Sequence, residues 1–234
     1  MRPARPLMLF AAGLGTRMGA LTADRPKPLI EVSGRALIDR ALDVALAAGS
    51  QPIVVNLHYR GERLAAHLAN RAVSLSWERD EILETGGGLR QALPMLGKGP
   101  VATLNPDAVW TGKNPLEQLE AAWDEARMDA LLLLAPVKDA NGHGSRADFT
   151  MADDGRLSRH AGVGSGYVYL GAQILRTEGL SEIPERVFSL NRLWDQMIAS
   201  GRAFGLVHRG GWCDVGRPEN IALAERMLLE AGHV

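Results

Sequence analysis

Two glycines and two cations lie close together near the start of the sequence, directly after an apolar run over Leu7–Ala12. Gly13 and Gly15 follow this run, Arg17 comes next, and Lys27 stands between two prolines ten residues further on. A strand that ends in a glycine loop presents consecutive backbone N–H groups, and such a concave arrangement binds anions. The segment is therefore predicted to hold a triphosphate. The glycine spacing alone fits neither the Rossmann nor the Walker A pattern, and a plain tight turn is its structural alternative.

Two acidic residues in distant segments are candidate metal ligands. Asp107 follows the apolar run Val101–Leu104, and Asp214 precedes a glycine and a predicted helix start. Ligands of open α/β sheets collect outside the carboxyl ends of the strands, and Mg²⁺ prefers oxygen ligands. The structural alternatives are a helix cap for Asp107 and a turn for Asp214. No cluster of histidine and cysteine residues has the spacing of a zinc site.

A third candidate segment ends in three consecutive glycines, Gly86–Gly88, after an alternating run over Val73–Trp77 that predicts a strand. Glycines allow a flat ligand to lie against bare backbone, whose N–H and C=O groups could recognise the edge of a nucleobase. The structural alternative is a flexible turn before a helix that starts near Gly88.

These strings, over residues 9–29, 81–88, 104–110 and 211–219, resemble the signatures of the sugar-1-phosphate nucleotidyltransferases. The similarity extends from Leu9 to about Leu229. It implies a Mg²⁺-dependent reaction of a nucleoside triphosphate with a sugar 1-phosphate, giving a nucleotide sugar and pyrophosphate. It also implies catalytic roles for Arg17, Lys27 and Asp107, and Mg²⁺ ligation by Asp107 and Asp214.

The resemblance further implies two sets of binding residues. Those expected to bind the nucleotide are Ala11, Ala12, Gly13, Leu14, Gly15, Thr16, Arg17, Met18, Lys27, Glu81, Thr85, Gly86, Gly87 and Asn105. Those expected to bind the sugar are Asn56, Asp148, Ser165 and Gly166. Among them Glu81 is expected to accept hydrogen bonds from the base, and its carboxylate suits uracil or guanine equally.

Asn56, the Glu-Thr-Gly-Gly-Gly string and Asp148-Phe149 resemble a short subgroup of the family. That subgroup includes N-acetylmuramic acid 1-phosphate uridylyltransferases, the main expectation here, and mannose-1-phosphate guanylyltransferases, so the nucleotide is UTP or GTP. Two departures from the family pattern, Ala20 for proline and Pro106 for glycine or serine, leave a third possibility. This is a catalytically inactive regulatory protein that binds sugar nucleotides.

Strand and helix signals alternate along the first half of the chain, which predicts an α/β fold. We expect a Rossmann-like three-layer α/β/α arrangement with a mixed, mostly parallel central sheet, as in the nucleotide-diphospho-sugar transferase fold. Residues 1–234 are predicted to form one domain, with a nucleotide-binding half to about residue 110 and a sugar-binding half after it. The hexapeptide repeats of a C-terminal β-helix are absent from the sequence.

Composition excludes several classes of partner. The net charge is −1 with a pI near 6.6, and no basic stripe points to nucleic acid. No segment approaches the ~20 apolar residues of a membrane span. The single cysteine, Cys213, fits a reducing compartment and is predicted to be a core residue rather than a nucleophile. We expect a cytoplasmic monomer or homodimer.

Overall fold

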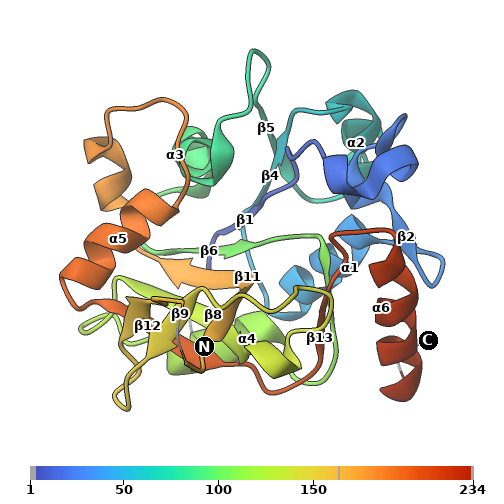
Figure 1. Ribbon diagram of the computed structural model, residues 1–234. Coiled ribbons are helices and arrows are strands. Elements are labelled where there is room, and N and C mark those ends of the chain that lie inside the picture. The colour runs from blue at the N-terminus through green and yellow to red at the C-terminus, as the bar shows by residue number, and fades with distance from the viewer. Residues whose placement is uncertain (1–3, 163, 233–234) are drawn as a thin grey trace.

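A nine-stranded sheet forms the centre of the computed structural model, which describes residues 4–162 and 164–232 (Figure 1). Its order is β10-β9-β11-β6-β1-β4-β5, and β8 pairs with both β11 and β12. The strands are β1 (Leu7–Leu9), β4 (Ile53–Leu57), β5 (Ser74–Trp77), β6 (Val101–Leu104), β8 (Ala130–Pro136), β9 (Phe149–Met151), β10 (Leu157–Arg159), β11 (Tyr167–Leu175) and β12 (Ala203–Val207).

The two parts of this sheet differ in strand direction. The strands β6, β1, β4 and β5 are parallel to one another, whereas β11 is antiparallel to β6, β8 and β9. A tight turn at Asp153–Gly155 joins β9 to β10, which pair as an antiparallel hairpin. The prediction of a mixed, helix-covered sheet is confirmed.

Helices cover both faces of the sheet, because alternate residues of each strand point to opposite sides. Leu7 and Leu9 belong to one buried cluster, and Met8 between them belongs to another. The first cluster includes residues of α1 (Leu37–Ala47), α2 (Gly61–Leu68) and α4 (Pro115–Ala122), and the second includes residues of α3 (Glu84–Leu96) and α5 (Asn191–Ala199). The two clusters lie on opposite faces of the sheet, so that helices, sheet and helices form the three predicted layers.

A smaller third cluster lies beside the sheet, under the C-terminal helix α6 (Glu219–Glu230). It includes residues of the short strands β2 (Glu31–Val32), β7 (Ala108–Trp110) and β13 (Trp212–Asp214); the two-residue β3 (Arg35–Ala36) pairs with β2. Burial, together with the nearby charge of Asp214, raises the pKa of Cys213 to about 12. Its thiol is therefore unreactive at neutral pH, as predicted for a core residue.

One helix boundary differs from that expected. The helix α3 begins at Glu84 rather than near Gly88, so the three glycines lie in its first turns. The helix α4 ends at Ala122, because Trp123 has extended backbone angles (φ −64°, ψ 123°). The four 3₁₀ segments are η1 (Thr16–Thr22), η2 (Lys27–Leu29), η3 (Val137–Asp139) and η4 (Glu178–Glu182). In the described residues, every helix is too short or too polar to cross a lipid bilayer.

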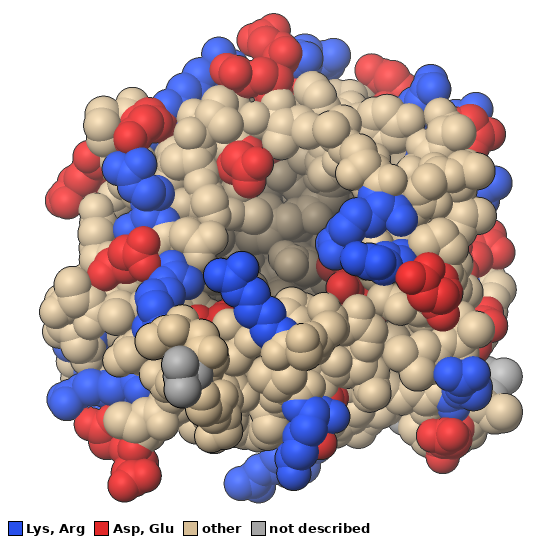
Figure 2. All heavy atoms as spheres, in the orientation of Figure 1, with Lys and Arg blue, Asp and Glu red and all other residues tan. Residues whose placement is uncertain are grey.

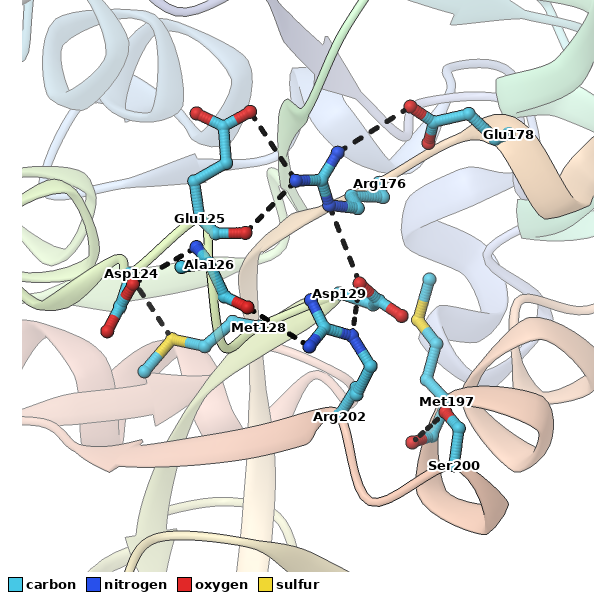
Figure 3. A network of polar contacts seen from close by, with 10 residues as sticks. All are labelled: Asp124, Glu125, Ala126, Met128, Asp129, Arg176, Glu178, Met197, Ser200 and Arg202. Atoms are coloured by element: carbon cyan, nitrogen blue, oxygen red, sulfur yellow. Dashed lines mark hydrogen bonds and ion pairs between the residues drawn. The ribbon is translucent and has the colours of Figure 1, made fainter.

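One polar network ties three strand ends together away from the glycine loop. The Asp129 carboxylate forms ion pairs with Arg202 Nε at 2.8 Å and with Arg176 Nε at 3.5 Å, as Figure 3 shows. Backbone bonds join the same residues, from Asp129 N to the Arg202 carbonyl and from Arg176 N to the Asp129 carbonyl. Since Asp129 precedes β8, Arg176 follows β11 and Arg202 precedes β12, the network fixes how these strands meet.

We predict that Asp129→Ala lowers the free energy of unfolding by about 1–2 kcal/mol, because two partly buried guanidinium groups lose their shared acceptor. Urea unfolding followed by circular dichroism measures this change. The matched control is Asp195→Ala, which removes an exposed partner of Arg159 and should cost less than ~0.5 kcal/mol. Equal losses in the two variants would show that the network adds nothing beyond an ordinary surface pair.

Candidate nucleotide-binding and metal site

A cavity of about 400 Å³ opens at the carboxyl ends of β1, β4, β5 and β6. Figure 2 shows the surface hollowed at the centre of one face, with basic side chains around part of the rim. The residues expected from the sequence that line this cavity are Ala11, Ala12, Gly13, Leu14, Gly15, Thr16, Arg17, Lys27, Asn56, Thr85, Asn105 and Asp107. The structure therefore gathers residues from five separate segments at the position expected for ligands of an α/β sheet.

The glycine loop presents a run of backbone amides to the cavity. In the described part of the chain, no protein group accepts a hydrogen bond from the amides of residues 12–17, whereas Ala11 N donates to Asn56 Oδ1 at 2.6 Å. Gly15 has a left-handed backbone (φ 64°), and a Cβ there would come within 3.0 Å of Lys27 Cβ. Because backbone N–H groups require acceptors, this loop is suited to an anion.

Lys27 is held close to the loop by its own short 3₁₀ turn, η2. Its ammonium Nζ lies 2.6 Å from Asp107 Oδ2, and only 11% of the side chain is exposed, against 31% for Asp107. The lysine thus brings a fixed positive charge to the floor of the cavity, where Arg17 also contributes charge.

Asp107 and Asp214 come together because β7 and β13 pair as antiparallel neighbours. Asp214 lies opposite Ala108, and Val215 N donates to the Asp107 carbonyl at 2.9 Å. Burial raises the pKa of Asp214, and the negative charge of Asp107 raises it further, while Lys27, Arg17 and His143 oppose the shift. Gly216, which lines the cavity, leaves room for the Asp214 carboxylate, since a Cβ there would lie 2.6 Å from Oδ2.

A buried hydrogen-bond chain closes the opposite end of the cavity. Asn56 Nδ2 donates to Glu78 Oε1 at 2.7 Å, and Glu78 Oε2 accepts from Leu83 N at 2.8 Å. Glu78 is 2% exposed and Asn56 4% exposed. Because Ala11 N bonds to the same asparagine, the chain links the glycine loop to the start of α3.

The three glycines of α3, Gly86–Gly88, allow neighbouring protein atoms to pack closely against the helix. The sequence had suggested instead that they leave bare backbone for a flat ligand. The amides of Gly86 and Gly87 both donate to the Phe188 carbonyl, at 2.9 and 3.1 Å, and neither glycine lines the cavity. A Cβ on Gly88 would lie 2.6 Å from Glu78 Oε1. These positions therefore need glycine because neighbouring protein atoms approach the helix closely.

Two further expected nucleotide ligands lie elsewhere. Met18 is 1% exposed and belongs to the cluster beneath α6, so its side chain faces the core. The Glu81 carboxylate pairs with Arg186 at 3.3 Å and is absent from the cavity lining. Neither side chain contributes to the cavity lining.

The three remaining candidate sugar ligands form a group beside β9 and β11, outside the cavity lining. Asp148 Oδ2 accepts a hydrogen bond from Tyr169 N at 2.9 Å. Gly166 approaches Ala147 so closely that a Cβ would collide with it, and Ser165 precedes Gly166 in the same loop. Since β9 and β11 lie beyond β6 in the sheet, this group is on the flank of the cavity that carries Asp107.

Sequence reasoning missed several lining residues, namely Phe10, Pro28, Glu78, Ile82, Glu84 and Gly216. The signal for Glu78 was available, because an acidic residue directly after a predicted buried strand is unusual and falls at the ligand-binding edge of the sheet. No residue pattern indicated Glu84, whose position depends on where α3 begins.

Comparisons with known proteins agree with this geometry. Residues 7–145 match the family described as the MobA-like NTP transferase domain. A Caulobacter vibrioides protein named N-acetylmuramate alpha-1-phosphate uridylyltransferase is 41% identical, covering 96% of this chain and 97% of the relative. A protein of the same name from Neisseria meningitidis is 31% identical, covering 89% of this chain and 92% of the relative.

A solved structure supports the fold independently. HddC from Yersinia pseudotuberculosis, crystallised with GMP-PN, aligns with a TM-score of 0.77 at 22% identity, covering 95% of this chain and 98% of that one. The sheet, the position of the cavity and the matched residues lead to one assignment. The chain belongs to the MobA-like NTP transferase family and is a nucleotidyltransferase.

Proposed function

We propose that this protein joins UTP to N-acetylmuramic acid 1-phosphate and releases pyrophosphate, with a divalent cation, Mg²⁺, as cofactor. The observation that carries the proposal is the convergence of Lys27, Asp107 and Asp214 beside a loop of unpaired amides. Two relatives, 41% and 31% identical to this chain, bear this name, and the chain spans 97% and 92% of their length.

The chemistry requires positioning and charge rather than a general base. In the reaction, a phosphate oxygen of the sugar 1-phosphate forms a bond to the α-phosphorus of UTP, and the bond from that phosphorus to the pyrophosphate oxygen breaks. The nucleophile is already ionised, so mutual repulsion of two anions is the main obstacle. Lys27 stabilises the charge that develops at the α-phosphate, and Arg17 with the loop amides holds the β- and γ-phosphates.

The residues present fit a divalent cation. Asp107 and Asp214 place two carboxylates together, and the raised pKa of Asp214 reflects burial and this mutual repulsion. Two carboxylates with substrate phosphates and waters are a common ligand set for Mg²⁺. In the described residues, no third histidine, cysteine or acid joins this pair. Asp107 and Asp214 would hold the cation, which supplies positive charge to the phosphates when bound.

The sugar would lie on the flank formed by β9 and β11, where Asp148 accepts sugar hydroxyl groups and Ser165 and Gly166 approach from the other side. Asn56 instead braces the nucleotide loop. We further propose that residues 1–234 act as one nucleotidyltransferase domain in the cytoplasm, as a monomer or homodimer. A catalytically inactive regulatory role is disfavoured, because Arg17, Lys27 and Asp107 line the same cavity despite Pro106, and the Asp214 carboxylate lies beside Gly216, which also lines it.

Pyrophosphate release with UTP, GTP, CTP and ATP, each combined with the 1-phosphates of N-acetylmuramic acid, mannose and glucose, tests the proposal. We expect UTP with N-acetylmuramic acid 1-phosphate to give the largest kcat/KM, and EDTA to abolish turnover. Preference for GTP with mannose 1-phosphate would establish the guanylyltransferase alternative. Nucleotide binding without turnover for any pair would establish the regulatory one.

Asp107→Ala and Lys27→Ala should each lower kcat by about 10²–10³, because each removes a charged group that stabilises the transition state. Steady-state assays at saturating substrate measure this loss, with circular dichroism verifying the fold. Asp43→Ala, which changes an exposed aspartate of α1, is the matched control. Near-normal turnover by either folded site variant would overturn the catalytic assignment.

Asp214→Asn should raise the thermal unfolding midpoint in EDTA at neutral pH while removing activity. A carboxyl group whose pKa is raised by folding destabilises the folded state when it is ionised, so neutral asparagine relieves that cost. The difference should shrink as the pH falls through the pKa of Asp214, since the wild-type carboxyl is then protonated as well. Scanning calorimetry over pH checks this, and an unchanged or lower midpoint at neutral pH would contradict it.

A further inference from the structure

Glu84 has a backbone conformation that side chains other than glycine rarely adopt. Its φ is +62°, in the left-handed region, at the first residue of α3. Residues in such strained conformations persist where the surrounding structure forces them, and they are frequent at ligand sites. Glu84 also lines the cavity of the proposed active site. A glycine would fit this backbone more easily, so the glutamate side chain itself requires an explanation.

The carboxylate of Glu84 differs from its two acidic neighbours in having no protein partner among residues 4–162 and 164–232. Both oxygens of Glu78 accept hydrogen bonds, from Asn56 Nδ2 and Leu83 N. The Glu81 carboxylate pairs with Arg186. Of these three acids, Glu84 is therefore the one that combines a cavity position with unused acceptor oxygens.

The order of strands indicates which part of the nucleotide lies near Glu84. Asp107 follows β6, the glycine loop follows β1, and Glu84 comes after β5, on the far side of β4. The glycine loop, Lys27 and Asp107 take up the phosphate end of the cavity, so the nucleoside, which is bonded to the α-phosphorus, extends into the part that remains, lined by Asn56, Glu78, Ile82 and Glu84. The end of the cavity near Glu84 is thus the place for the base.

We propose that Glu84 determines base specificity by accepting a hydrogen bond from a ring N–H on the pairing edge of the base. This proposal rests on the proposed function. Uracil presents N3–H there, and guanine presents N1–H with its amino group. Cytosine N3 and adenine N1 are acceptors, so a carboxylate oxygen that faces the ring nitrogen is repelled, and only the neighbouring amino group of these bases can donate to the other oxygen. Glu84 thus favours UTP or GTP over CTP and ATP.

Glu84→Gln is the informative substitution, because it keeps the size and backbone strain of the side chain but supplies an N–H donor. We expect the ratio of kcat/KM for the preferred nucleotide to that for CTP to fall at least tenfold. Glu84→Gly should lose the same discrimination and unfold at a higher temperature, because the strained φ suits glycine. Glu81→Gln is the matched control and should retain the wild-type ratio. UTP and GTP are assayed separately, which identifies the base that Glu84 accepts.

Calorimetric titration of the four nucleotides into the same variants with Mg²⁺ separates this inference from the catalytic proposal. If the wild type shows no turnover, the proposed function fails, and the binding ratios alone decide the role of Glu84. Wild-type discrimination in Glu84→Gln, by turnover or by binding, would overturn the inference while leaving the proposed function intact. Loss of discrimination in Glu81→Gln instead would assign the role to that residue.

Discussion

The pairing of β7 with β13 is the constraint on which the rest of the site depends. Electrostatics alone would separate Asp107 from Asp214, and the raised pKa of Asp214 reflects that repulsion. Backbone hydrogen bonds hold them together instead, including the one from Val215 N to the Asp107 carbonyl. The side chain of Asn220 in α6 adds two hydrogen bonds, from Nδ2 to the carbonyls of Asp214 and Gly142 at 2.9 and 3.0 Å. The folded chain thus maintains an unfavourable pair of charges at the position where a cation is useful.

The other end of the cavity is held by different means. The Asn56–Glu78 pair is buried and hydrogen-bonded, and it connects β4 with the loops that follow β1 and β5. Burying such a network costs little free energy when its polar groups have hydrogen-bond partners. It leaves no room for a side chain at position 88, because a Cβ there would lie 2.6 Å from Glu78 Oε1. The buried hydrogen-bonded end, where we propose that the base binds, and the charged end proposed for the phosphates therefore lie on one sheet, with loops supplying many of the lining residues.

The sequence predicted the fold and the phosphate end well because both depend on local signals. The apolar runs indicated the positions of strands such as β1 and β6. The string from Gly13 to Arg17, together with Lys27, indicated the loop that lines the cavity. Glu81, Gly86 and Gly87, which were expected to bind the nucleotide, are absent from the cavity lining. Their surroundings depend on where α3 begins and on which residues pack against it. The Phe188 carbonyl and Arg186, which occupy these groups, lie about a hundred positions away in the sequence, and no local pattern reveals them.

The long strand β11 limits where the chain could be truncated without loss of the folded sheet. It lies between β6 and β8 and is paired with both, and its bulge near Gly171 accommodates Asn105 from the cavity rim. The stretch that matches the family, residues 7–145, stops before this strand. A fragment ending there would leave two buried hydrophobic strands without their shared partner, exposing open edges that favour self-association. Expression of the first part alone should thus give insoluble material rather than a small nucleotide-binding module.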